Sequence, residues 1–141
     1  MSLSDSEKTL IVESIRIAEK QTSGEIRVHV EKFCPGNNPL DRATEIFHQL
    51  NMQQTAARNG VLVYVALNDR KFSVIGDEGI HAKVGSDFWS EMANELKAHL
   101  VKNEIAAGIC AAVALAGQKL KVHFPYSGND KNELSDEISE A

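Results

Sequence analysis

The chain has 141 residues, about the size of a single domain. Hydrophobic residues make up 43% and charged residues 25%, which excludes wholesale disorder and fibrous repeats. The formal net charge of −5 disfavours nucleic acid as the main partner, because the chain has no surplus of basic side chains to offset the repulsion of phosphates.

A helix is predicted first, because Ser4 and Glu7 have the spacing of a capping box. The apolar stripe of this helix continues at helical spacing, and the helix is expected to stop near residues 22–24. Residues 25–31 then alternate between apolar and polar side chains, so they predict a strand with one buried face. After a loop at 33–38, Pro39 can open a second helix, which runs to about residue 50.

The middle of the chain predicts a β-hairpin. Residues 60–67 are apolar on both faces, as in a strand that is covered on both sides. A short turn at 68–70 leads to a strand at 71–76, and residues 76–79 break the pattern.

Two helices are expected to follow the hairpin. Ser86 or Asp87 can cap the first, and Asn103 can cap the second, which runs to about Lys121. The second is apolar on nearly all sides from 105 to 115, which predicts the most buried helix of the fold. Residues 1–125 are therefore expected to form one domain, and the acidic stretch 126–141 is read as a polar, solvated tail.

This order of elements, α-β-α-β-β-α-α, predicts an α/β three-layer sandwich. A crossover helix joins the first two strands, so these should be parallel, while the hairpin makes the third strand antiparallel to the second. The result is a small mixed sheet with helices on both faces.

The two cysteines carry no metal or disulfide signal. Cys34 and Cys110 form neither a CxxC pair nor a zinc pattern, and we expect free thiols in a reducing compartment.

The first ten residues lack the features of a signal peptide, and the longest uncharged stretch, 105–117, is too short and too rich in alanine for a bilayer span. We therefore expect a soluble, cytoplasmic, monomeric protein without a membrane span.

The predicted topology brings three separate segments to one edge of the sheet. Residues 22–25 and 58–60 lie where the two parallel strands begin, and residues 76–79 lie where the antiparallel strand ends. These segments carry the candidate ligand-binding residues Glu25, Arg58 and Asn59. They also carry Asp77 and Glu78 as candidate metal ligands, with Asp87 approaching from the next helix.

The chemistry of this edge has two interpretations. Several carboxylates repel one another unless a cation lies among them, and oxygen ligands suit Ca²⁺ or Mg²⁺. Alternatively, Arg58 pairs with Glu25 or Asp77 in a structural salt bridge, and Asp77 caps a turn. No nucleophile–base pair is visible in the sequence, so catalytic residues are not assigned.

The ordered set of motifs resembles the TPM domain family, which is named for thylakoid and photosystem-repair proteins. The set covers nearly the whole chain and comprises Thr22-Ser23-Gly24-Glu25-Ile26, Arg58-Asn59-Gly60, Gly76-Asp77-Glu78-Gly79, Phe88-Trp89, Gly108-Ile109, Phe124-Pro125 and Asn132-Glu133-Leu134. The resemblance implies an α/β sandwich with an acidic, loop-lined cleft that binds divalent cations in some relatives. It also implies weak acid phosphatase activity, which is associated with plant relatives.

Two functions follow from the residues and the resemblance together. The first is a stand-alone, bacterial-type accessory module that binds Ca²⁺ or Mg²⁺ in the cleft and docks to a protein partner. The second is a weak metal-assisted phosphatase acting on phosphomonoesters, with Arg58 on the phosphoryl group and Asp77 as a metal ligand or general base.

Overall fold

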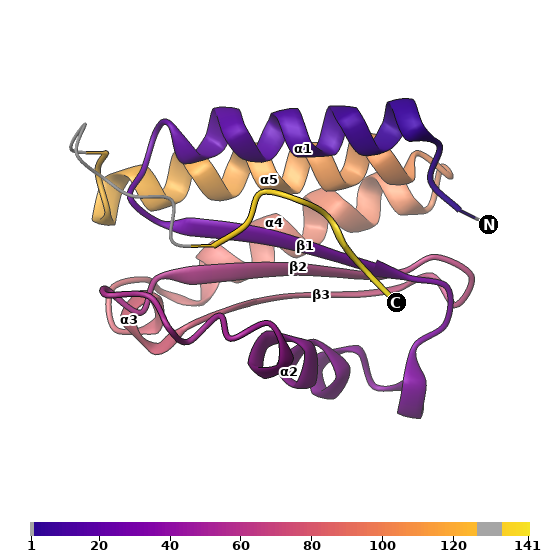
Figure 1. Cartoon of the computed structure of the whole chain (residues 1–141), viewed down its shortest axis with the longest axis horizontal. Helices are drawn as coiled ribbons and strands as arrows, with labels where there is room; N and C mark the ends of the chain where they lie inside the picture. Colours follow the sequence, from indigo (N-terminus) through magenta and orange to yellow (C-terminus); the bar gives the residue numbers. More distant parts are fainter. Residues whose placement is uncertain (1, 127–133) are drawn as a thin grey trace.

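A computed structural model describes residues 2–126 and 134–141 of the chain (Figure 1). The elements, in chain order, are α1 (Asp5–Glu19), β1 (Glu25–Glu31), the 3-10 turn η1 (Pro35–Asn37), α2 (Pro39–Gln49), β2 (Gly60–Ala66), β3 (Lys71–Gly76), α3 (Glu78–His81), α4 (Ser86–Leu100), α5 (Ile105–His123) and β4 (Ser139–Glu140). Part of the predicted tail, 127–133, lies outside the described residues.

The helix starts follow local capping chemistry. The capping box of α1 is confirmed, because the Glu7 amide donates to Ser4 Oγ at 3.2 Å and the Ser4 amide donates to Glu7 Oε1 at 2.9 Å. Pro39 opens α2 as predicted, with Asn38 as the cap that accepts the Asp41 amide at 3.1 Å.

Two predicted caps are wrong by one or two residues. The cap of α4 is Gly85 rather than Ser86 or Asp87, which are already helical. The cap of α5 is Glu104 rather than Asn103, which has a φ of 60°. This left-handed residue lies in a short turn where the Glu104 amide bonds back to the His99 carbonyl at 3.0 Å, so the chain reverses before the helix begins.

The sheet has the predicted polarity. Its order is β3-β2-β1-β4, with β1 parallel to β2 and β3 antiparallel to β2. Glu25 lies opposite Gly60, and Val61 lies opposite Gly76, so the start of β1, the start of β2 and the end of β3 share one edge. The α/β sandwich with a small mixed sheet is therefore confirmed.

The fourth strand was not predicted from the sequence. β4 runs parallel to β1 and pairs with it at His29 and Val30 only. Figure 1 shows the C-terminal segment crossing over the sheet beside β1. This pairing adds Ser139 and Glu140 to the sheet, and it was missed because two residues of strand are too short to leave a periodic signal.

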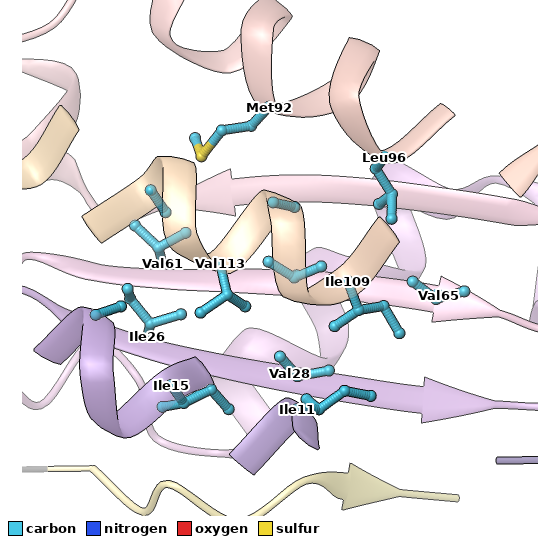
Figure 2. Packing of buried hydrophobic residues seen from close by; sticks show 14 of the residues in the cluster. Ile11, Ile15, Ile26, Val28, Val61, Val65, Met92, Leu96, Ile109 and Val113 are labelled. Atoms are coloured by element: carbon cyan, nitrogen blue, oxygen red, sulfur yellow. The ribbon is translucent and has the colours of Figure 1, made fainter. Parts of the chain in front are cut away.

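The main core lies between the sheet and three helices. Figure 2 shows Ile11 and Ile15 of α1, Met92 and Leu96 of α4, and Ile109 and Val113 of α5 gathered over the apolar face of β1 and β2. A smaller cluster lies on the other face, where α2 packs on the sheet. Residues on both faces of β2 are buried, as its apolar sequence predicted.

Helix α5 is the central helix of the main core. It packs against α1 and α4, and nine of its residues are buried. The helix has 19 residues and is long and apolar enough to cross a membrane. A helix buried in a protein core can have the same length and composition.

The contact between α1 and α5 depends on a small residue. A Cβ placed on Gly117 would lie 2.8 Å from Ala18 Cβ and 3.1 Å from its Cα. We therefore predict that Gly117→Val forces the two helices apart and lowers the free energy of unfolding by about 1–3 kcal/mol in chemical denaturation.

Ala114→Val is the matched control for this prediction, because Ala114 is an exposed residue of the same helix. It should cost about 0.5 kcal/mol, the difference in helix propensity alone. Equal losses for the two variants would contradict the close-packing argument.

Candidate functional site

Backbone hydrogen bonds join the three predicted segments at the shared edge of the sheet. The Glu25 amide donates to the Asn59 carbonyl at 3.2 Å, and the Asp77 amide donates to the Gly60 carbonyl at 2.9 Å. The Gly79 amide donates to the Arg58 carbonyl at 2.9 Å. The structure thus brings residues 22–25, 58–60 and 76–79 together, and we call this group of segments the loop edge.

Close backbone packing explains why position 79 of the loop edge is a glycine. A Cβ on Gly79 would lie 2.2 Å from the Ala57 carbonyl oxygen and 2.6 Å from the Arg58 carbonyl oxygen. No L-side chain fits in that space without moving the backbone, so Gly79 lets the start of α3 rest directly on the loop that carries Arg58.

Arg58 and Asp77 form the central ion pair of the loop edge. Arg58 Nε lies 2.7 Å from Asp77 Oδ2, and Nη2 lies 2.8 Å from Oδ1, which is the two-pronged geometry of a strong guanidinium–carboxylate pair. Arg58 Nη1 also lies 3.2 Å from Glu78 Oε1. The hydrogen bonds with Asp77 raise the pKa of Arg58 above its ordinary value. The predicted salt bridge therefore forms with Asp77.

The three charged side chains differ in exposure. The side chain of Asp77 is 5% exposed, that of Arg58 is 40% exposed, and that of Glu78 is 73% exposed. Asp77 also caps α3, because Oδ1 accepts the Glu78 amide at 2.8 Å. Asp77 is thus a fixed anchor that holds the accessible side chain of Arg58 in place, and Arg58 in turn contacts Glu78.

Asn59 holds the loop edge together from inside. It is 2% exposed, and its Nδ2 donates to the Ser23 carbonyl at 3.3 Å. Its backbone amide donates to Thr55 Oγ1 at 3.2 Å. These bonds connect the loop before β2 to the start of β1, so the candidate ligand-binding residue Asn59 supports the loop edge from inside.

Glu25 begins β1 at the loop edge, but its carboxyl group is hydrogen-bonded to Glu19 at the end of α1. Asp136 of the C-terminal segment is hydrogen-bonded to the same Glu19. Burial, together with these two acidic neighbours, raises the pKa of Glu19 to about 10, although the hydrogen bond from the Ile26 amide opposes the shift. The Glu19 carboxyl therefore keeps its proton at neutral pH.

Asp87 is exposed in the first turn of α4. Within residues 2–126 and 134–141, no hydrogen bond or ion pair connects it with Asp77 or Glu78. Of the six candidate residues, Arg58, Asp77 and Glu78 form one cluster, Asn59 supports it, and Glu25 and Asp87 have other surroundings.

The fit of a divalent cation to the loop edge is limited by Arg58. In the part of the chain that the structure describes, no group of three or more His, Cys, Asp or Glu side chains is arranged to hold a metal ion. Asp77 and Glu78 offer two carboxylates with a guanidinium between them. Such a pair suits a cation that keeps much of its water, as Mg²⁺ does, rather than one enclosed by protein ligands.

A family model described as the TPM domain matches residues 2–119 of the chain. The chain belongs to the TPM domain family. The match confirms the resemblance that the motifs indicated.

A solved structure with high similarity to this TPM domain is that of the BA42 protein from the psychrophilic bacterium Bizionia argentinensis. The two share 40% identity with a TM-score of 0.93, over 100% of this chain and 97% of that one. No functionally curated protein matches the chain.

Two bacterial domains share the fold at lower identity. The N-terminal domain of cg2496 from Corynebacterium glutamicum is 14% identical with a TM-score of 0.68, over 99% of this chain and 80% of that one. An N-terminal domain from P. gingivalis is 18% identical with a TM-score of 0.70, over 89% and 82%.

A buried polar cluster near the other end of β1 in this TPM domain was not predicted from the sequence. Arg42 of α2 binds both oxygens of Glu31, with Nε–Oε2 and Nη2–Oε1 distances of 2.9 Å, and the Tyr64 hydroxyl donates to the same carboxylate. His29 Nδ1 lies 2.9 Å from Ser139 Oγ of β4. The sequence contains no periodic signal for this cluster, because its members come from β1, α2, β2 and β4.

Burial and pairing act in opposite directions on this polar cluster. Burial disfavours ionisation of Glu31, but the hydrogen bonds from Arg42 and Tyr64 outweigh it and hold the pKa of Glu31 below its ordinary value. Burial lowers the pKa of His29, although the charge of Glu31 partly offsets this. The cluster therefore holds α2 and β4 to β1 with an ionised Glu31 and a neutral His29 at pH 7.

The Glu19 carboxyl gives this TPM domain a testable pH dependence. Its pKa of about 10 lies above the ordinary 4.5, so the folded state holds a proton that the unfolded state releases between those values. Stability from this group is complete below pH 4.5 and falls as pH rises toward 10. We predict that Glu19→Gln, which cannot titrate, gains stability relative to the parent from pH 5 to 9, by at most about 1.4 kcal/mol per pH unit.

The measurement is chemical denaturation at a series of pH values. Glu13→Gln is the matched control, because Glu13 is on the same helix with a side chain that is 59% exposed. Parallel pH curves for the parent and Glu19→Gln would show that Glu19 does not carry the proton.

Proposed function

We propose that this TPM domain is a binding module that works without catalysis, and that its loop edge takes a divalent cation, Ca²⁺ or Mg²⁺, and docks a protein partner. The observation that supports this most is the ion cluster itself. Arg58 acts as an internal cation between Asp77 and Glu78, and its side chain is accessible enough to be replaced. A site that already balances two carboxylates with one positive group can exchange that group for a metal ion.

The engagement of Asp77 favours binding over catalysis. A general base needs a free lone pair directed at the proton that it removes. Both oxygens of Asp77 are bound to Arg58, and Oδ1 also accepts the Glu78 amide. Asp77 is therefore better suited to hold a charge in place than to move a proton.

Exchange between Arg58 and a cation is consistent with the exposure of Glu78. Its side chain is 73% exposed, and its contact with Arg58 Nη1 is 3.2 Å, the longest of the three contacts in the cluster. Glu78 can turn away from Arg58 at little cost, since exposed ion pairs contribute only about 0–1 kcal/mol. Glu78 would then supply one ligand, Asp77 a second, and water the remainder.

The proposal is tested by thermal unfolding in Ca²⁺ or Mg²⁺ at millimolar concentration. A cation that binds the folded state raises the melting temperature by mass action. We predict that Asp77→Asn abolishes this increase, because asparagine preserves the cap of α3 but removes the charge. Arg58→Gln should enlarge the increase, because it removes the internal competitor.

Asp87→Asn is the matched control and should leave the increase unchanged, because Asp87 is not joined to the cluster. The cation proposal is wrong if the melting temperature of the folded parent does not change, or if Asp77→Asn responds as the parent does. If Asp87→Asn alone loses the increase in melting temperature, the cation site lies on α4 and not at the loop edge.

Weak phosphatase activity is the second proposed function, and the exposed guanidinium of Arg58 favours it. The family model that matches the chain also carries the word phosphatase in its name. A guanidinium that is 40% exposed and fixed by a buried carboxylate can stabilise charge on a phosphoryl group.

The decisive measurement for the second function is turnover of a phosphomonoester with Mg²⁺ present. Arg58→Ala should lower kcat/KM by at least about tenfold, because it removes the group that contacts the transition state, and Asp77→Asn should do the same, because it removes the carboxylate that holds Arg58 in place. Activity that persists in both variants would indicate a contaminating enzyme.

The cytoplasmic location and the monomeric state remain predictions from the sequence.

A further inference from the structure

A basic groove lies at the same end of the molecule as the loop edge, between the start of α4 and the end of α5, where the Phe124 carbonyl accepts the Ser23 amide at 2.8 Å. Its volume is about 380 Å³, which is within the range of small-molecule sites. Three basic side chains line it: Lys83, Lys119 and His123. None of the described residues that line the groove is acidic, in a chain whose net charge is −5.

Local contacts fix the two lysines of the groove. Lys83 Nζ lies 4.7 Å from the centre of the Phe124 ring, in a cation–π contact. Lys119 Nζ lies 2.7 Å from Glu91 Oε2, and the lysine side chain is 23% exposed. The charge of Lys119 is partly balanced by Glu91, so Lys83 is the main source of uncompensated positive charge.

The remaining walls of the groove are apolar. Val84 and Phe88 line it on the α4 side, and Val122 lines it on the α5 side. Val122 is 76% exposed. Covering Val122 would remove apolar surface from water and stabilise a bound molecule.

We propose that this groove binds a small organic carboxylate: an anionic head beside Lys83 with an aliphatic or aromatic body against Val84, Phe88 and Val122. The lysines attract the head, and the apolar walls favour a ligand with a body over a bare inorganic anion. The site is independent of the loop edge and does not depend on the proposed function.

The experiment is a titration of the full chain, labelled with ¹⁵N, with hexanoate, acetate and hexanol. Hexanoate should produce saturable amide shifts at Val84, Gly85 and Val122. Acetate, which lacks the apolar body, and hexanol, which lacks the charge, should each bind at least about fivefold more weakly.

Two variants locate the anionic head. Lys83→Gln should weaken hexanoate binding about fivefold, while Lys102→Gln, which removes an equal charge from an exposed residue outside the groove, should not change it. Asp77→Asn should also leave hexanoate binding unchanged, which separates this groove from the cation proposal.

Four results would overturn the inference. They are the absence of saturable shifts, hexanol binding as tightly as hexanoate, acetate binding as tightly as hexanoate, and equal effects of Lys83→Gln and Lys102→Gln. Each of these outcomes is measurable on folded protein, because both lysines are exposed.

Discussion

The parallel pairing of β1 with β2 is the constraint on which the rest of this structure depends. Parallel strands need a crossover, and here α2 provides it on one face of the sheet while α1, α4 and α5 cover the other. Once the two strands are parallel, their starts lie side by side. The tight hairpin then returns the end of β3 to the same edge, so Arg58 and Asp77 meet although 18 residues separate them along the chain.

Charge pairing repeats at both ends of β1. At one end, Arg58 binds both oxygens of Asp77, and at the other, Arg42 binds both oxygens of Glu31. The surroundings give the two pairs different roles. The Glu31 pair is covered by α2 and serves the fold, whereas the guanidinium of Arg58 remains accessible and can respond to a ligand.

At the end of α1, a proton on Glu19 reduces the repulsion between neighbouring carboxyls. Glu19, Glu25 and Asp136 come from α1, β1 and the C-terminal segment, and their closeness would be unfavourable if all three were ionised. The proton on Glu19 lets the C-terminal segment lie against the end of α1, where Asp136 is hydrogen-bonded to Glu19. The segment is further held by Lys8, whose Nζ lies 3.1 Å from Glu140 Oε1. The described part of the C-terminal segment, residues 134–141, is thus part of the fold, because Asp136 is bonded to Glu19 and Glu140 is paired with Lys8.

The sequence by itself determined the order of the elements, the strand polarity and the meeting of three segments at one edge. These features depend on local periodicity, on capping chemistry and on the general rules for connecting strands. The caps of α4 and α5 differed by one or two residues, because neighbouring residues compete for a cap and the turn geometry decides between them.

Only the tertiary structure decided which charged groups are partners. Spacing placed Glu25, Arg58 and Asp77 at one edge, but it did not show that Arg58 takes Asp77 while Glu25 joins Glu19. The same holds for β4 and for the Glu31 cluster, since both are built from residues distant in the chain. Side-chain direction and long-range contact are properties of the packed molecule, and they leave no periodic pattern in the sequence.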